Sequence, residues 1–337
     1  MTSGPWTIYA RQLFPLSYGH PLWGPEPCLT FGEVHLGDVG YLKDGHFSLL
    51  FNATRSADDP VNSLRGVPDG FQVLDLPEHM IRRRPNEITQ PLLHSKSLQA
   101  TLIAASVSLR SVTSCQHFAL RYHCQAEEGA LLMLKKPAHR TYLNCDLRVR
   151  RYIRENMSSW CAFANDKLEI GLEEKDIIFV SGYTKTPVWA EAAFSHSSAS
   201  GELVIAGGVP SASGEFRVSM SRAVDSSVFS RTGPLDRASM WEKDSEPSET
   251  YDQCIFLNYY KMKSRAWWRS TVIRAAAGDH VFRYDGDDYG TSGAGSCSSS
   301  DEEDIQDEVE EAYDPVDSLL NYILKVNQLM FIAYIAH

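Results

Sequence analysis

The segment Asp146-Leu-Arg-Val-Arg-Arg-Tyr-Ile-Arg-Glu-Asn-Met-Ser-Ser-Trp-Cys-Ala-Phe-Ala164 carries the clearest structural pattern in the sequence. Its apolar side chains recur at the spacing of an α-helix, at Val149, Tyr152, Ile153, Met157, Trp160 and Ala164. Arginines at positions 148, 150, 151 and 154 lie around the opposite face. The pattern predicts an amphipathic helix over residues 146–164, with Tyr152 and Trp160 buried and with Arg148, Arg151 and Arg154 exposed.

The segments around this helix are typical of antiparallel β-structure. In residues 115–124, alternation places Phe118, Leu120, Tyr122 and Cys124 on one face of a strand. Similar runs predict strands at residues 46–51, 71–76, 97–109, 129–134, 176–181, 188–194, 202–206, 215–220 and 254–260, with turns at 37–45, 67–70 and 182–187. Residues 267–277 fit either a helix or a strand. Prolines at positions 5, 15, 21, 25 and 27 argue for an irregular lead-in over residues 1–30.

Charge divides the chain into segments. Residues 285–337 hold 13 acidic side chains and one basic side chain, Lys325, so the net charge of −11 describes this tail, while the body is close to neutral. We therefore expect an α+β body over residues 1–284, built on a mainly antiparallel sheet with one long amphipathic helix. Residues 285–312 have the composition of a disordered acidic linker.

A C-terminal helix is predicted over residues 313–337, capped by Asp314 with Pro315 in its first turn. A membrane-spanning helix is not expected, because Asp317, Lys325, Asn327 and Gln328 interrupt it. Two interpretations of residues 326–337 stay open. They continue an amphipathic helix that docks on the body or on a partner, or they are translated intron, since Val326-Asn327 can be encoded by a sequence with the form of a splice donor.

Cysteine usage and the N-terminal sequence favour a cytoplasmic protein. The seven cysteines are an odd number without a CxxC pair, which is typical of reduced thiols. No basic stretch followed by an apolar run stands at the N-terminus, so we expect no secretory signal.

Motifs that carry chemistry are missing or incomplete. The chain has no GxGxxG and no GxxxxGK[ST], and residues 182–186 lack the glycines of a phosphate loop. Residues 290–294 do not complete GxSxG, and residues 285–296 end on Ser296 where a calcium loop needs glutamate. Cys115 and His117 share a strand face, but two ligands do not make a zinc site. We therefore assign no catalytic residue, no metal and no cofactor.

Two basic clusters are candidate contacts for anionic lipid. The first is the arginine face at Arg148, Arg151 and Arg154, whose simpler interpretation is a solvated helix face. The second interleaves bases with aromatic residues, as membrane-interface segments do; its alternative is an edge strand with inward aromatics and outward lysines. Nucleic acid is not an expected partner. The second cluster comprises Lys261, Lys263, Arg265, Trp267, Trp268 and Arg269.

Four blocks of the sequence carry a resemblance. They are Leu36-Gly-Asp-Val-Gly-Tyr-Leu42, Glu128-Gly-Ala-Leu-Leu132, Asp176-Ile-Ile-Phe-Val-Ser-Gly182 and Tyr313-Asp-Pro-Val316. Spread over most of the chain, they resemble a set of proteins from mushroom-forming fungi. This resemblance implies no particular activity.

The order of elements also resembles gasdermin pore-forming domains. Residues 97–134 predict a long hairpin, residues 146–164 an amphipathic helix, and residues 176–195 a second strand pair, followed by an acidic linker. The resemblance covers residues 70–337 and implies a membrane-active protein of intracellular defence or cell death. No diagnostic residue carries over, and residues 1–20 lack the basic first helix of that family.

Three functions therefore compete. The first is a non-enzymatic, gasdermin-like protein that needs amphipathic hairpins and basic residues to meet anionic lipid. The second is a non-catalytic module whose acidic tail binds a protein partner. The third is an enzyme with an unfamiliar site lined by His35, Asp38 or His46.

Overall fold

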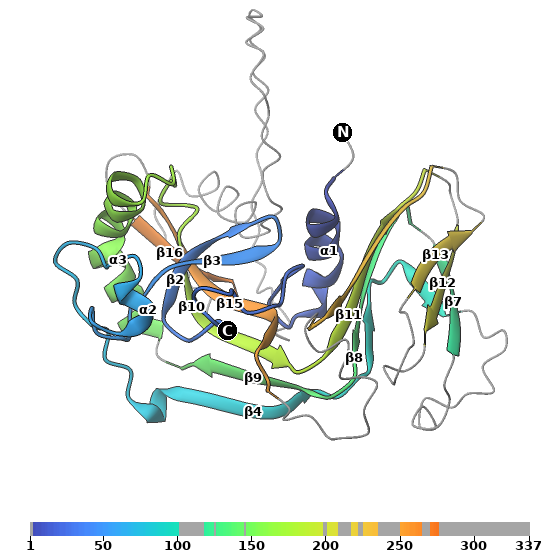
Figure 1. The fold of residues 1–337 in the computed structure, drawn as a ribbon, viewed down its shortest axis with the longest axis horizontal. Coiled ribbons are helices and arrows are strands. Elements are labelled where there is room, and N and C mark those ends of the chain that lie inside the picture. The colour runs from blue at the N-terminus through green and yellow to red at the C-terminus, as the bar shows by residue number, and fades with distance from the viewer. Residues whose placement is uncertain are drawn as a thin grey trace, which may run out of the picture.

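The computed structural model describes residues 3–100, 118–124, 126–144, 146–197, 201–207, 217–221, 225–234, 250–264 and 270–275. The protein is α+β, and the described strand pairs are all antiparallel (Figure 1). The expected segments 285–312 and 313–337 lie outside the described residues, so the linker and the C-terminal helix stay predictions.

The largest sheet is organised around two long strands, β10 (Ile178–Thr186) and β15 (Gln253–Ser264), which pair with each other. The apolar run at the start of β10 suits this central place, because both faces of the strand are covered. On its other side β10 pairs with β2 and β9, while β15 also pairs with β1 and β16. The flanking strands are β1 (His20–Pro21), β2 (Asp38–Lys43), β3 (His46–Asn52), β4 (Ile81–Ile88), β9 (Ala138–Leu143) and β16 (Ser270–Ala275).

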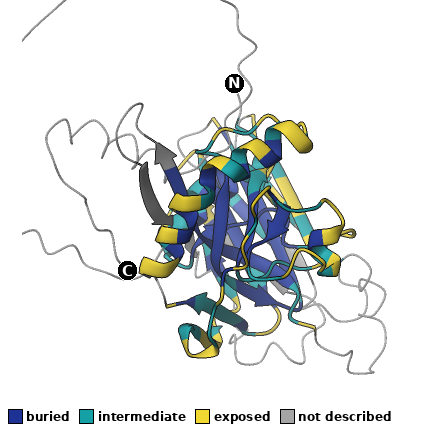
Figure 2. Ribbon diagram, turned by 90° about the vertical axis from the view of Figure 1, so that its left-hand side faces the viewer, coloured by how far each residue is buried: buried dark blue, intermediate teal, exposed yellow. Residues whose placement is uncertain are grey.

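The predicted amphipathic helix is present as α3 (Asp146–Ala162), followed by a π-helical turn at Phe163–Lys167. Trp160 and Tyr152 are buried, and Trp160 packs against Phe51 and Phe179. Arg148, Arg151 and Arg154 are exposed. The expected division of the helix into a buried and an exposed face is therefore confirmed, and Figure 2 shows buried and exposed residues alternating along the helices on this side of the molecule.

Several local predictions were wrong. Residues 5–13 form the helix α1 (Pro5–Leu13), followed by a 3-10 turn at Phe14–Leu16; Pro5 opens α1, where its missing N–H is not needed. Residues 37–45, expected as turns, contain the strand β2, which pairs with β3 in a hairpin. Residues 71–76 form no strand; they pack as a loop on the core, with α2 (Pro60–Ser63) and a 3-10 turn at Glu78–Met80 nearby in sequence.

The predicted turn at 182–187 was also wrong, because β10 continues through it. Register shifts beside Gly182 and Lys185 let the strand bend without ending. Gly182 is required there, since a Cβ would lie 2.8 Å from the Cβ of Tyr142 on β9. The strand thus changes partners from β2 to β9 along its length.

Two four-stranded sheets complete the fold. We call the sheet β14-β11-β8-β5 the proximal sheet and the sheet β13-β12-β7-β6 the distal sheet. α1 packs on the proximal sheet between it and the large sheet (Figure 1). The strands are β5 (Leu92–His94), β6 (Leu98–Ala100), β7 (Phe118–Cys124), β8 (Glu128–Leu134), β11 (Trp189–Ser195), β12 (Gly201–Gly207), β13 (Arg217–Ser221) and β14 (Ser227–Gly233).

Candidate functional site

The proximal and distal sheets are two halves of the same two hairpins. Hairpin A (residues 92–134) runs through β5 and β6 and returns through β7 and β8. Hairpin B (residues 189–233) runs through β11 and β12 and returns through β13 and β14. The hairpins are neighbours, because β8 pairs with β11 and β7 pairs with β12. The result is one four-stranded ladder that bends once between its halves.

At the bend the hairpins fold back, so that the distal sheet packs face to face on the proximal sheet. Leu131, Ala192 and Phe194 of the proximal sheet share one apolar core with Leu203 and Ile205 of the distal sheet. Figure 1 shows β7, β12 and β13 standing beside β8 and β11. We call this shared core the fold-back core; its buried members are Leu98, Tyr122, Cys124, Leu131, Ala192, Phe194, Leu203 and Ile205.

His196 follows β11 at the bend and contacts both β11 and the residue that precedes β8. The backbone N–H of His196 donates to the carbonyl of Glu127 over 2.7 Å. The ring of His196 is buried and stacks on Phe194, and within the described residues neither of its ring nitrogens has a hydrogen-bond partner. Phe194 in turn lies over Gly129, where a Cβ would come within 2.3 Å of its ring.

The other face of the proximal sheet carries a buried ionisable group. Glu191 on β11 is fully buried, and burial raises the pKa of its carboxyl well above the usual range. The nearby Arg231 guanidinium on β14 lowers this pKa only in part, across 3.7 Å. Burial and the neighbouring Glu191 also raise the pKa of Tyr9 on α1. Burial therefore disfavours the charged form of Glu191.

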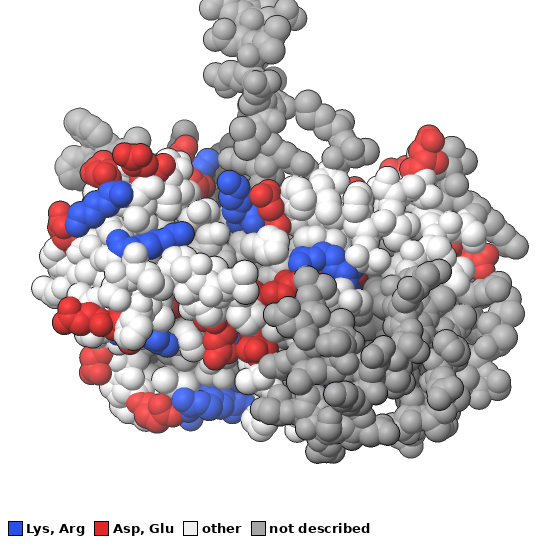
Figure 3. Space-filling view, in the orientation of Figure 1, with Lys and Arg blue, Asp and Glu red and all other residues white. Residues whose placement is uncertain are grey.

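The arginines predicted on α3 lie on the surface, as expected, but they are not all free. The guanidinium of Arg148 donates to the carbonyl of Asp75 over 2.8 Å and lies 3.6 Å from its carboxylate. Arg151 and Arg154 form no ion pair with any described residue. The face of the body in Figure 3 mixes both signs of charge and shows no large field of positive charge.

The second predicted cluster is not a surface strand where the structure describes it. Lys261 is only 4% exposed on β15, which is an interior strand of the large sheet, so neither a lipid contact at Lys261 nor an edge strand with outward lysines fits. The backbone of Lys263 lies on the same strand. Arg265, Trp267, Trp268 and Arg269 lie outside the described residues.

A further row of arginines was missed by the sequence analysis. Arg82, Arg83 and Arg84 are exposed on β4, which pairs with β9 alone among the described strands. The run of three arginines before Pro85 is visible in the sequence, but its place at a sheet edge is not. Charged residues and proline protect such an edge from pairing with another chain.

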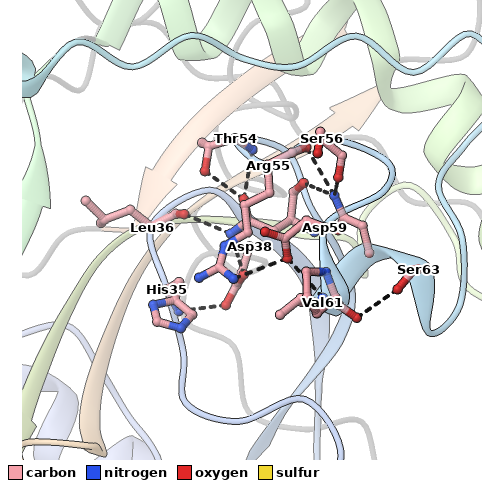
Figure 4. Close-up of polar contacts among 12 residues, drawn as sticks. His35, Leu36, Asp38, Thr54, Arg55, Ser56, Asp59, Val61 and Ser63 are labelled. Carbon is pink, nitrogen blue, oxygen red and sulfur yellow. Dashed lines mark hydrogen bonds and ion pairs between the residues drawn. The ribbon is translucent and has the colours of Figure 1, made fainter.

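The residues of the enzyme interpretation do not assemble into a site. Both carboxylate oxygens of Asp38 are occupied, by the backbone N–H of His35 and by the side-chain amide of Asn52, each over 2.7 Å (Figure 4). Burial raises the pKa of Asp38 to about 7, and burial lowers the pKa of His35. His46 lies at the opposite end of the β2–β3 hairpin from Asp38. Asp38 is buried, with 2% of its surface exposed, and its hydrogen bonds organise the loops around it.

The described residues offer neither a metal centre nor a membrane-spanning helix. Within them, no group of three or more His, Cys, Asp or Glu side chains could hold a metal ion. No helix in the described ranges has both the length and the apolar character required to cross a bilayer. No family model and no curated protein matches the chain, so these comparisons leave the two resemblances untested.

Proposed function

We propose that this chain is a non-enzymatic, gasdermin-like membrane-active protein whose two hairpins straighten at the bend and insert together as one four-stranded unit. The observation that carries the proposal is the fold-back of two neighbouring hairpins on a core of their own.

Sheet geometry supports the proposal. When a sheet is folded in half, the two surfaces that meet belong to the same face of its strands. Straightening the hairpins would place Leu131, Ala192 and Phe194 on one apolar face with Leu203 and Ile205 if a one-residue bulge is kept at the bend, because Phe194 and Leu203 lie nine positions apart and side chains alternate along a strand. A lipid-facing strand surface needs such a face.

The opposite face carries paired polar groups in both halves, next to apolar residues such as Leu132 and Trp189 in the proximal half. His123 is exposed and Glu202 is half-buried, and the two are cross-strand partners there. In the proximal half, Glu191 and Arg231 are likewise cross-strand partners on this face. Alternation of an apolar and a polar face along each strand is the sequence signature of transmembrane β-strands.

Length and charge at the far ends also suit insertion. Joined end to end, β11 and β12, of seven residues each, exceed the about 9–11 residues that a tilted transmembrane strand takes. The sequences that join the distal strands, residues 101–117 and 208–216, contain one charged residue each, Arg110 and Glu215. Few charges would therefore have to cross the bilayer with each hairpin.

In this proposal the protein resides in the cytoplasm and its partner is the anionic lipid of a membrane surface. Arg151 and Arg154, which form no ion pair with the described residues, are the best placed of the predicted contacts. The arginine row at Arg82–Arg84 offers further positive charge near the start of hairpin A. Each basic residue near an anionic surface contributes about 1 kcal/mol of attraction.

Dye release from liposomes tests the proposal with a matched pair of variants on β13. Val218 packs against the fold-back core, whereas its neighbour Ser219 is exposed on the other face. Full-length chain should release dye from vesicles with phosphatidylserine and not from vesicles of phosphatidylcholine alone. Val218→Glu should slow release at least severalfold, because a charged side chain that faces lipid destabilises a transmembrane strand, and Ser219→Glu should retain release.

Circular dichroism and the unfolding midpoint show whether each variant is folded, and Val218→Gln replaces Val218→Glu if the latter is not. Equal dye release by both folded variants would contradict the assignment of faces. No release from anionic vesicles by the full-length chain would contradict the proposed function.

A further inference from the structure

The N-terminal segment, residues 5–26, covers the face of the proximal sheet that carries Glu191 and Arg231. Ile8, Tyr9 and Leu13 of α1 pack in one core with Trp189 of β11 and Leu132 of β8. The ring of Tyr9 meets Trp23 edge-on, with the ring centroids 5.3 Å apart, which joins the helix to the loop after it. This face of the hairpins is therefore closed by a segment far away in sequence.

Hairpin A is joined to this segment by an ion pair. Arg11 on α1 pairs with Glu128 at the start of β8, and both side chains are partly buried. Glu128 lies directly beside the bend, opposite Ser195 of β11. The ion pair thus connects α1 to the point at which the hairpins would straighten.

Hairpin B is joined to the N-terminal segment through Arg231 on β14. Its guanidinium lies 2.7 Å from the carboxylate of Glu26 and donates to the backbone carbonyl of Trp23. The same group lies 3.7 Å from Glu191 on the neighbouring strand β11. One side chain of hairpin B is therefore held by two residues of the N-terminal segment.

We propose that residues 5–26 form a clasp that keeps both hairpins folded back and that must leave before they straighten. The inference rests on the proposed function for its purpose, but the clasp itself can be measured without a membrane. The clasp makes polar contacts with β8 and β14, and its Tyr9 lies against Glu191 of β11. Of the four strands of the proximal sheet, only β5 has no such contact among those described.

The charges explain why the clasp would act as a unit. Glu191 is buried and Arg231 is half-buried under the N-terminal segment, and both occupy the face that would meet water in the inserted state. Removal of Arg231 would leave Glu26 and Glu191 next to each other without their shared cation. An uncompensated buried carboxylate is strongly destabilising, so the segment should detach.

Hydrogen exchange by mass spectrometry of the full-length chain tests the clasp. Arg231→Gln should raise amide exchange about tenfold or more in α1 and, at the same time, in β8, β11 and β14, with β10 unchanged. Arg83→Gln is the matched control, because Arg83 also pairs with a glutamate, Glu78, but on the exposed edge strand. Arg83→Gln should leave amide exchange unchanged in all of these segments.

Faster exchange in α1 alone would overturn the proposal, because the hairpins would then stay closed without the clasp, and unchanged exchange everywhere would overturn it as well. Dye release by the same variants separates the two ideas. Faster exchange in the hairpins without any dye release by Arg231→Gln supports the clasp and contradicts the proposed function. Dye release by the unaltered chain, together with unchanged exchange in Arg231→Gln, supports the proposed function and contradicts the clasp.

Discussion

Glu191 and Arg231 face each other across neighbouring strands of hairpin B, with a carboxylate oxygen and a guanidinium nitrogen 3.7 Å apart. This distance is too long for a strong charge-assisted hydrogen bond. Arg231 is instead turned toward Glu26, 2.7 Å away. Glu191 is thus a buried acid whose nearest cation is held by another carboxylate.

We expect stability to fall as the pH rises, and Glu191→Gln to weaken this effect. An acid whose pKa is raised in the folded state binds its proton more tightly there, so its stabilisation is complete below its unfolded pKa and is lost as pH rises through the folded pKa. Burial acts in this direction on Glu191, and on Asp38, whose pKa is about 7. Urea unfolding between about pH 5 and pH 9 measures the difference.

The charged groups that act on Glu191 are Arg231 and Glu26, together with the hydroxyl of Tyr9. Because all of them remain in Glu191→Gln, the change in slope reports Glu191 itself. Identical pH dependence in the variant and the unaltered chain would show that the carboxyl is ionised in the folded state.

Trp160→Ala should lower the free energy of unfolding by about 3–5 kcal/mol. Trp160 is 1% exposed and contacts Phe51, Tyr152 and Phe179, so truncation leaves a cavity between α3 and the large sheet. Leu147→Ala on the same helix is the control, because Leu147 is 69% exposed, and it should change stability by less than about 0.5 kcal/mol. A small effect at Trp160 would contradict the packing of α3.

Asp38→Asn should destabilise the protein by about 1–3 kcal/mol, although it is nearly isosteric. Both oxygens of Asp38 accept hydrogen bonds, from His35 and Asn52, so one of these donors would face the amide NH2 of an asparagine. Asp59→Asn is the control, because Asp59 caps α2 through Val61 and asparagine caps equally well. Comparable melting temperatures for the two variants would be inconsistent with the Asp38 network.

Gly129→Ala should loosen the bend of the hairpins. The new Cβ would lie 2.3 Å from the buried ring of Phe194, its cross-strand partner, so strand or ring must shift. Phe194→Leu removes the obstructing ring atoms, and the double variant should therefore cost less than the sum of the single variants. Additive losses in urea unfolding would show that Gly129 and Phe194 do not meet.

Elements with a strong local pattern could be predicted from the sequence. Helix α3 was predicted because the burial of Val149 and Trp160 follows a period that lies within one segment. The faces of β7 were predicted for the same reason, since Tyr122 and Cys124 are buried and His123 is exposed. The strand β4 was missed, because its arginines carry no apolar alternation.

Other elements depended on partners that are distant in sequence. Pro5 suggested an irregular segment, yet α1 forms because the proximal sheet supplies an apolar surface for Ile8 and Leu13. Residues 71–76 have a strand-like composition but pair with no strand. Lys261 was expected at the surface, yet the neighbours of β15 bury it.

The sequence by itself determined the α+β class, the helix α3 with its arginine face, and the segregation of acidic charge beyond residue 285, because periodicity and composition are local properties. Only the tertiary structure decided that hairpins A and B lie side by side, fold back on a shared core and meet residues 5–26 at Glu191 and Arg231. The ion pairs of residues 5–26 with the hairpins join residues more than 100 positions apart, such as Arg11 and Glu128. Contacts of that kind arise from how separate surfaces bury one another, which no local pattern encodes.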